Sequence, residues 1–299
     1  MGAPYVQTFT PVIGSLACNA RCPYCCSRMT CTYGMTNKEP DYDWESFDIA
    51  AQIARERQCI TAFITSKGEP TLFPSTVNQT VIRLKEKHHF PIIELQTNGI
   101  LFSSLSSNGI LKAWKNSGLN IICLSTVHWD REVSRGIYGP SYPDLSEMTE
   151  ACLSAGLKIR VSCVMLKGYV DSFPTVEKFR EECTKLRVDQ LTIRPVSVPY
   201  KCCDDNEQWR LEWIKKHEPD YDNQKRIYTL LESNSSAKRN LAHGAKVYSI
   251  QMEPGKPDVN ICLSNCFTPP TKDEEIRQII WLPNGRITDN WDHEGLIIL

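Results

Sequence analysis

The sequence predicts an α/β fold whose core is a parallel sheet, either an incomplete (β/α) barrel or an open sheet. Segments with strand-like apolar patterns alternate with segments of helical period, which is typical of strands joined by crossover helices. The segment LNIICLSTV at 119–127 is apolar almost throughout, as expected for a strand covered on both faces. We count six strands before residue 200, whereas eight would close a standard barrel. In either architecture a ligand binds at the carboxyl ends of the strands.

The first half of this region alternates three strands with three helices. QTFTPVIGSL at 7–16 is the first strand, and residues 43–57 have the apolar period of a helix. A short buried strand begins at Cys59 and ends in the turn KGEP. The next elements are predicted to be a helix at 74–88, a strand at 91–99 that ends in TNG, and a helix at 107–118 that stops at Gly118.

The second half repeats the same unit. After the strand at 119–127, the pattern predicts a helix at 144–155, a strand at 157–166, a helix at 172–186 and a strand at 189–196. The segments NSGLNIICLS and SAGLKIRVSC begin 38 positions apart. In each, a glycine ends a predicted helix and a buried strand follows directly. This similarity favours stacked strand-helix repeats.

Residues 201–299 lack the regular alternation of strands and helices found in residues 1–200. We predict that they form a C-terminal α+β extension that caps the active-site face. The segment 206–233 is charged and aromatic, and it predicts a helix broken near Pro219. KVYSIQME indicates a strand, and RQIIWLPNGRITDNW predicts a hairpin. The hairpin should turn at Asn284-Gly285, because this pair is the strongest short hairpin signal.

Composition and charge favour a cytoplasmic protein with a small or neutral partner. The chain has 34.1 kDa of mass, enough to bury a full core, and its 34 Lys plus Arg balance 35 Asp plus Glu. A formal charge of −1 without a long basic run makes nucleic acid or an anionic membrane an unfavoured partner. We find neither a signal peptide pattern nor an apolar run long enough to span a membrane.

Fourteen cysteines are too few for a disulfide scaffold in a chain of this size and many for a cytosolic enzyme. Single cysteines in apolar segments are interpreted as small buried hydrophobic residues; these are Cys59, Cys123, Cys152, Cys163 and Cys183. The stretch CNARCPYCC is different, because folding does not require four cysteines in nine positions.

Cys18, Cys22 and Cys25 fall at CxxxCxxC spacing on one short loop after the first strand. A structural zinc site is closed by four ligands, usually from two separated pairs. Three thiolates on one loop instead leave a coordination position open, which suits an iron-sulfur cluster with one iron left for a substrate or cofactor.

This loop resembles the CxxxCxφC signature of the radical S-adenosylmethionine (SAM) superfamily, with Tyr24 in the aromatic position. The turn Lys67-Gly68-Glu69-Pro70 after the second strand resembles the GGEP motif of that family, and Thr97-Asn98-Gly99 after the third resembles its TNG turn. The three motifs lie at successive strand ends in the expected order. The resemblance covers about residues 8–200 and leaves the extension unrecognised.

The resemblance implies a partial (β/α)6 TIM-like barrel and a [4Fe-4S] cluster bound by Cys18, Cys22 and Cys25. SAM would chelate the fourth iron, and reductive cleavage would produce a 5′-deoxyadenosyl radical that abstracts a hydrogen atom from the substrate. It also implies a flavodoxin- or ferredoxin-type electron donor. Further SAM contacts carried over from the family are Tyr24, Gly68, Glu69, Asn98, Ser125 and Ser162. Arg194 is a further candidate because it ends the sixth strand.

Each of these contacts has a reason in residue chemistry. Gly68 would allow a close backbone approach to the methionine moiety, and Glu69 would accept a hydrogen bond from its ammonium group. Tyr24 would meet the adenine through its backbone, and Ser125 and Ser162 would present hydroxyls at strand ends. Arg194 could hold a carboxylate or phosphate with two hydrogen bonds, although a structural salt bridge is equally consistent with its position.

Some residues depart from the family pattern. Lys67 replaces the first glycine of GGEP, and it would meet an acidic substrate or be solvated. Cys26 is excluded as a ligand because adjacent residues on a tight loop point apart. Residues 128–138, which include His128, Trp129, Asp130, Arg131, Arg135 and Tyr138, are predicted to form a loop on the active face that contacts the substrate.

Cys202, Cys203, Cys262 and Cys266 have the number of thiols that an auxiliary iron-sulfur cluster needs, but not the expected spacing. Buried or reactive single thiols are the alternative reading.

Three functions stay open at this point. The first is radical SAM chemistry on a small metabolite or nucleoside, and the second is the same chemistry on a ribosomal peptide. The third is a non-catalytic zinc-binding module, which would have no need of the KGEP and TNG turns.

Overall fold

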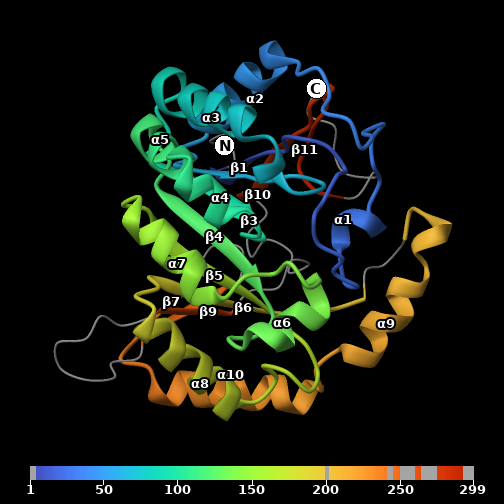
Figure 1. Ribbon diagram of the computed structural model, residues 1–299, viewed down its shortest axis with the longest axis vertical. Coiled ribbons are helices and arrows are strands. Elements are labelled where there is room, and N and C mark those ends of the chain that lie inside the picture. Colours follow the sequence, from blue (N-terminus) through green and yellow to red (C-terminus); the bar gives the residue numbers. More distant parts are fainter. Residues whose placement is uncertain (1–4, 199–201, 241–244, 250–259, 264–274, 292–299) are drawn as a thin grey trace.

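The computed structural model describes residues 5–198, 202–240, 245–249, 260–263 and 275–291. Its centre is one eleven-stranded sheet in the order β11-β10-β1-β2-β3-β4-β5-β6-β9-β8-β7 (Figure 1). The strands are β1 (Tyr5–Pro11), β2 (Thr61–Ile64), β3 (Ile92–Thr97), β4 (Ile121–Thr126), β5 (Lys158–Met165), β6 (Gln190–Pro195), β7 (Ala237–Asn240), β8 (Lys246–Ser249), β9 (Asn260–Leu263), β10 (Glu275–Trp281) and β11 (Ile287–Thr288).

Helices connect the strands and lie mainly outside the curved sheet (Figure 1). The α-helices are α1 (Cys26–Met29), α2 (Trp44–Glu56), α3 (Pro74–Ile82), α4 (Phe102–Ser107), α5 (Ile110–Ser117), α6 (Arg131–Tyr138), α7 (Leu145–Ser154), α8 (Phe173–Lys185), α9 (Trp209–His217) and α10 (Tyr221–Asn234). Other helical turns are η1 (Pro70–Leu72), η2 (Arg83–Lys87) and η3 (Asp205–Glu207).

Strands β1 to β6 pair in parallel in sequence order, which confirms the six predicted strands. In the described part of the chain, β11 and β7 end the sheet on its two sides, so the barrel is not closed. The fold is therefore the predicted α/β partial barrel. Since the strands are parallel, the loops that follow β1, β2 and β3 meet at one edge.

The strands of the extension continue the same sheet at both edges. β10 pairs in parallel with β1, and β9 pairs in parallel with β6. β10 and β11 form an antiparallel hairpin around the turn with Gly285 at φ +86°, which confirms the predicted hairpin. The pairing of β9 with β6 and of β10 with β1 was not predicted, because local sequence patterns do not identify strand partners more than 50 residues away.

The hydrophobic core joins the barrel and the extension. Phe9 of β1 packs against Phe47 of α2, with ring centroids 5.5 Å apart, and Trp281 of β10 packs against the same Phe47 ring at 5.0 Å. The five single cysteines assigned to the core are all buried, as predicted. Within the described residues, no helix is both long and apolar enough to cross a bilayer.

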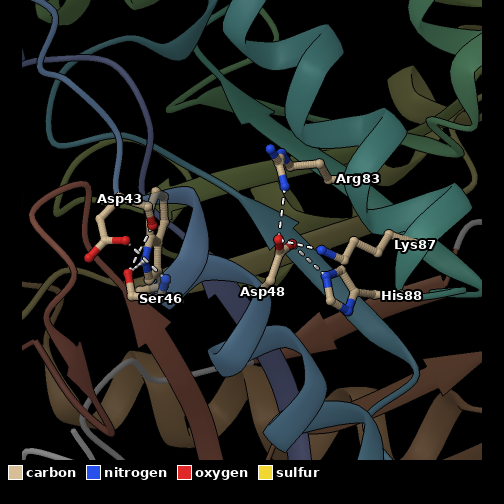
Figure 2. A network of polar contacts seen from close by, with 7 residues as sticks. Asp43, Ser46, Asp48, Arg83, Lys87 and His88 are labelled. Atoms are coloured by element: carbon tan, nitrogen blue, oxygen red, sulfur yellow. Dashed lines mark hydrogen bonds and ion pairs between the residues drawn. The ribbon is translucent and has the colours of Figure 1, made fainter.

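A polar network fastens α2 to the end of the next helical segment (Figure 2). Asp48 accepts hydrogen bonds from Arg83 at 2.9 Å, Lys87 at 2.7 Å and His88 at 2.8 Å. Burial acts to raise the pKa of Asp48, but the hydrogen bonds from His88 and Lys87 and the charge of Arg83 together lower it. Asp43 caps α2 by accepting from the amide of Ser46.

Local structure differs from the prediction in a few helices. The helix predicted at 74–88 ends in a π-helical turn, η2. The helix predicted at 107–118 is α5, which begins at Ile110, and the short helix α4 before it was not predicted. The break near Pro219 between α9 and α10 is confirmed. Residues 131–138, predicted as a loop, form helix α6, because the Asp130 carboxylate caps the amides of Glu132 and Val133.

Candidate metal and cofactor site

Cys18, Cys22 and Cys25 lie on the loop between β1 and α1, which we call the cysteine loop (residues 18–25). All three are half-buried separate thiols. The loop turns tightly, since the amide of Cys25 donates to the carbonyl of Cys22 at 3.2 Å. The amide of Arg21 donates to the carbonyl of Tyr138 at 3.0 Å, so the C-terminal end of α6 holds the loop from one side.

Burial disfavours the ionised form of two thiols of the cysteine loop, Cys18 and Cys22. Burial raises the pKa of Cys18 to about 11, although the amide of Ala20 opposes this shift. Burial also raises the pKa of Cys22 well above its usual value, and the nearby Cys25 and Cys18 add to the shift. Bound metal ions remove this penalty because they favour the thiolate.

The donor set fits an iron-sulfur cluster. Thiolates are the ligands that such clusters require, and two N-H groups point at the Cys18 sulfur: the amide of Ala20 at 3.4 Å and the Asn98 side chain at 3.9 Å. Among the described residues, no three His, Cys, Asp or Glu side chains converge on one point that could hold a single metal ion. A cubane differs from a single ion because its protein ligands bind different irons.

Gly68 lies directly against the base of the cysteine loop. A Cβ atom at Gly68 would lie 2.0 Å from the carbonyl oxygen of Ala17 and 2.7 Å from that of Ser15. The next amide, that of Glu69, donates to the Ala17 carbonyl at 2.9 Å. Glycine is thus required here by contact between two loops, a reason that we did not predict.

The Glu69 carboxylate joins the ends of β2 and β3. Its Oε1 accepts from the hydroxyl of Thr97 at 2.6 Å and from the amide and hydroxyl of Thr71, and its Oε2 accepts from the amide of Asn98 at 3.0 Å. Burial raises the pKa of Glu69, while these hydrogen bonds oppose the shift. A carboxylate oxygen can accept more than one hydrogen bond, so Oε2 has capacity for a further donor.

Asn98 connects the TNG turn to the cysteine loop. Its side-chain Nδ2 donates to Oδ1 of Asn19 at 2.8 Å, in addition to its contact with Cys18. The three sequence motifs, which are separated by up to 80 positions, therefore meet at one edge of the sheet, as expected for successive parallel strands.

Tyr24 packs its ring away from solvent between two helices. Its hydroxyl donates to the hydroxyl of Tyr138 in α6 at 2.7 Å, and its ring lies 6.2 Å from that of Trp213 in α9. Burial raises the pKa of Tyr24 well above its usual value. The side chain therefore anchors the cysteine loop, while the backbone is the part proposed to meet adenine.

Ser125, Ser162 and Arg194 face the interior of the partial barrel. Ser125 pairs in register with Ser162, and Ser162 with Thr192, which places their side chains on one face of the sheet. Thr192 and Arg194 line an interior cavity of about 260 Å³. Its walls also include the first residues of β2 to β6, so it lies toward the amino ends of the strands, away from the cysteine loop.

The walls of this cavity are charged as well as polar. The buried Glu94 and the half-buried Arg160 form an ion pair inside it, with one contact of 2.9 Å between Arg160 Nε and Glu94 Oε2. Along β5, the side chains that face the interior, such as Arg160 and Ser162, are half-buried, whereas those that face the helices are buried.

Lys67 is buried, so the predicted solvated position is wrong. It is only 2% exposed, donates to the Thr30 hydroxyl at 2.6 Å, and lies over the rings of Tyr33 and Trp291 at 5.5 and 5.3 Å. Burial lowers the pKa of Lys67, and the nearby thiols of Cys26, Cys31, Cys203 and Cys25 oppose the shift. The side chain packs because its neighbours supply aromatic faces and a hydroxyl acceptor.

Arg210 is the site residue that the sequence motifs missed. From α9 of the extension, its Nη1 donates to the carbonyls of Cys22 at 2.6 Å and Pro23 at 3.1 Å. Glu207 holds the guanidinium in place through Nε at 2.5 Å. The positive charge of Arg210 also acts to lower the pKa of Cys22, against its burial. No local signal could have identified this contact across 188 positions.

The four cysteines considered for an auxiliary cluster have different surroundings. Cys202 is buried and donates to the carbonyl of Asp204, while Cys203 contacts Cys31 with sulfurs 3.3 Å apart. Cys262 lines the interior cavity beside Arg160 and Arg194. Cys266 lies outside the described residues.

Comparison with known proteins identifies related sequences and folds. A family model described as the radical SAM superfamily matches residues 12–179. The crystal structure of Streptococcus suis SuiB has a TM-score of 0.63 at 14% identity, covering 96% of this chain and 60% of SuiB. The form bound to SAM has a TM-score of 0.64 at 13% identity, with the same shares covered. The form bound to the precursor peptide SuiA has a TM-score of 0.55 at 15% identity, again covering 96% and 60%.

The likeness to SuiB is one of fold, and the chain spans about 60% of the length of SuiB. No curated protein matches this chain.

Proposed function

Because this chain belongs to the radical SAM superfamily, as the match over residues 12–179 shows, we propose that Cys18, Cys22 and Cys25 bind a [4Fe-4S] cluster. When bound and reduced, such a cluster supplies the electron that cleaves SAM into methionine and a 5′-deoxyadenosyl radical, which takes a hydrogen atom from the substrate. The observation that carries the proposal is the placement of three thiols beside the ends of β2 and β3. Because the radical SAM superfamily is a family of enzymes, this match argues against a non-catalytic zinc-binding module.

The residues around the loop would bind and orient SAM. Glu69 Oε2 has room to accept from an ammonium group, and Asn98 would keep the TNG turn against the cysteine loop. The Tyr24 backbone would meet the adenine. Ser125 and Ser162 would donate from the barrel interior, and Arg194 would hold a carboxylate or phosphate.

We propose a small metabolite or nucleoside as the substrate. The polar side chains of Ser125 and Ser162, which pair in register on the interior face of the sheet, support a compact polar molecule. A peptide is the second candidate, because SuiB, a fold relative, binds its precursor peptide SuiA. A flavodoxin- or ferredoxin-type protein of the cytoplasm would deliver the electron, and the reducing conditions of that compartment suit separate thiols.

The function is tested with Cys22→Ala in anaerobically reconstituted enzyme. The variant should lose 5′-deoxyadenosine formation, measured by chromatography after reduction with dithionite, because a cubane with two protein thiolates is not held in place. Cys26→Ala, which changes the exposed neighbour of the ligand set, is the matched control and should retain activity. Undiminished SAM cleavage by Cys22→Ala would refute the assignment.

The two substrate classes are separated with fractionated cell extract. Reduced enzyme and SAM are incubated with the low-mass fraction before and after protease treatment, and product masses are compared. If the substrate is a metabolite or nucleoside, the protease-treated fraction should still stimulate 5′-deoxyadenosine formation. If protease treatment abolishes this stimulation, the substrate is a peptide and the metabolite proposal is wrong.

A further inference from the structure

Two cysteines outside the cysteine loop meet across the boundary between the barrel and the extension. Cys31 follows α1, and Cys203 follows β6, 172 positions later in the sequence. Their sulfur atoms lie 3.3 Å apart. Neither residue belongs to the ligand set proposed for the cluster, and neither is part of the hydrophobic core, since Cys31 is half-buried and Cys203 is exposed.

The two thiols line an open cavity of about 610 Å³ on the outside of the barrel. Arg28, Thr30, Tyr33 and Arg286 contribute to its walls, together with Asp204. A molecule of the size of a tripeptide can therefore approach both sulfurs. Access is the first requirement for a reactive thiol, because buried cysteines are inert.

A backbone contact holds this pair in place. The amide of Cys203 donates to the carbonyl of Met29 at 2.8 Å, which fixes the two chain segments next to each other. Disulfide sulfurs are about 2.0 Å apart, so each sulfur needs to move by less than about 1 Å to form a bond.

We propose that Cys31 and Cys203 form a redox-active dithiol whose reactant is a low-molecular-weight disulfide. The thiolate of one cysteine attacks a sulfur of the small disulfide, and the first small thiol leaves. The second cysteine thiolate then attacks the mixed disulfide, forms the Cys31–Cys203 bond and releases the second small thiol. The two cysteine thiols lose two electrons and two protons, which reduce the small disulfide to two thiols.

The new bond fastens the extension to the segment that follows the cysteine loop. Arg210, seven positions after Cys203, grips the carbonyls of Cys22 and Pro23 in the same region. Oxidation therefore adds a covalent link to a contact that otherwise depends on hydrogen bonds. The proposal concerns thiol chemistry alone and does not depend on SAM cleavage.

The test uses the anaerobically reconstituted full-length protein with oxidised glutathione, followed by alkylation and tryptic mapping without reduction. Cleavage after Lys and Arg separates the relevant cysteines into peptides 22–28, 29–38 and 202–210. We expect a cross-linked pair of 29–38 with 202–210 that is two hydrogens lighter than the sum of its peptides. Dithiothreitol should separate the pair.

Variants assign the bond to single residues. The cross-link should be lost in Cys31→Ser and in Cys203→Ser and persist in Cys202→Ser, which changes the buried cysteine of the same peptide. It should also persist in Cys26→Ser. A cross-link of 202–210 to 22–28, its loss in Cys202→Ser, or glutathione adducts without a cross-link would overturn the proposal. Circular dichroism spectra that match the parent protein confirm that each variant is folded.

Discussion

At the scale of single residues, the cysteine loop depends on groups that its own motif does not contain. Arg210 neutralises two carbonyl dipoles of the loop and places a positive charge near Cys22. Gly68 allows the KGEP turn to approach within hydrogen-bonding distance of Ala17. The identity of the ligands is therefore a local property of the motif, whereas the shape of the loop is imposed by its neighbours.

Replacing Arg210 should weaken the hold on the cluster. We expect Arg210→Met to lose bound iron several-fold faster in the presence of a chelator and to shift the cluster potential to more negative values, because a buried positive charge favours the reduced, more negative form. Iron release and a redox titration followed by electron paramagnetic resonance measure the two effects. Arg210→Lys should restore the potential more fully than the iron retention, since lysine keeps the charge without the planar fork. Equal iron release from Arg210→Met and the parent protein would contradict this role.

Gly68→Ala should destabilise the protein by roughly 2 kcal/mol or more, since a Cβ atom at 2.0 Å from a carbonyl oxygen forces the two loops apart. Thermal unfolding of the metal-free protein measures the loss. Gly136→Ala in α6 is the matched control, because no atom lies within 4 Å of its added Cβ atom. That control should be neutral or stabilising by up to about 1 kcal/mol. Equal unfolding temperatures of Gly68→Ala and Gly136→Ala would show that the loops accommodate the added methyl group and would contradict this prediction.

At the scale of elements, side-chain networks set how the helices sit on the sheet. The Asp48 network joins α2 to η2 and to His88, just before β3 (Figure 2). Periodicity correctly predicted α2 and most of the helix that ends in η2. It missed α6, because the capping carboxylate of Asp130 stands outside the apolar pattern that periodicity detects.

The Asp48 network has a pH dependence with a definite sign. The pKa of Asp48 is lowered on folding, so its contribution is fully present above the unfolded value of about 4 and is lost as the pH falls through the lower folded value. Asp48→Asn should therefore cost roughly 1–2 kcal/mol at pH 7 and much less below pH 3, measured by urea unfolding. Asp41→Asn, an exposed change next to α2, should stay within about 0.5 kcal/mol. A cost for Asp48→Asn that does not vary with pH would reject the mechanism.

At the scale of the whole molecule, residues from both ends of the sequence complete one sheet. β10 covers the edge of β1 and β9 covers the edge of β6. Trp281 of β10 is fully buried against α2. The barrel strands therefore have neighbours on both sides only when the extension is present.

A chain truncated after residue 198 should not fold into a soluble monomer. Loss of β9 and β10 exposes the backbone edges of β6 and β1, and exposed edges pair with other chains. Size-exclusion chromatography and thermal unfolding, with the full chain as the control, test this expectation. A soluble monomer that unfolds cooperatively would instead support residues 1–200 as an independent domain.

The sequence alone determined the alternation of six parallel strands with helices and the three motif turns at successive strand ends, because these depend on patterns within about ten neighbouring residues. Only the tertiary structure decided that β9 and β10 extend the two edges of the sheet, that Arg210 grips the cysteine loop, and that Cys31 meets Cys203. These contacts join residues more than 65 positions apart, and their partners are selected by packing across the assembled sheet rather than by any local propensity.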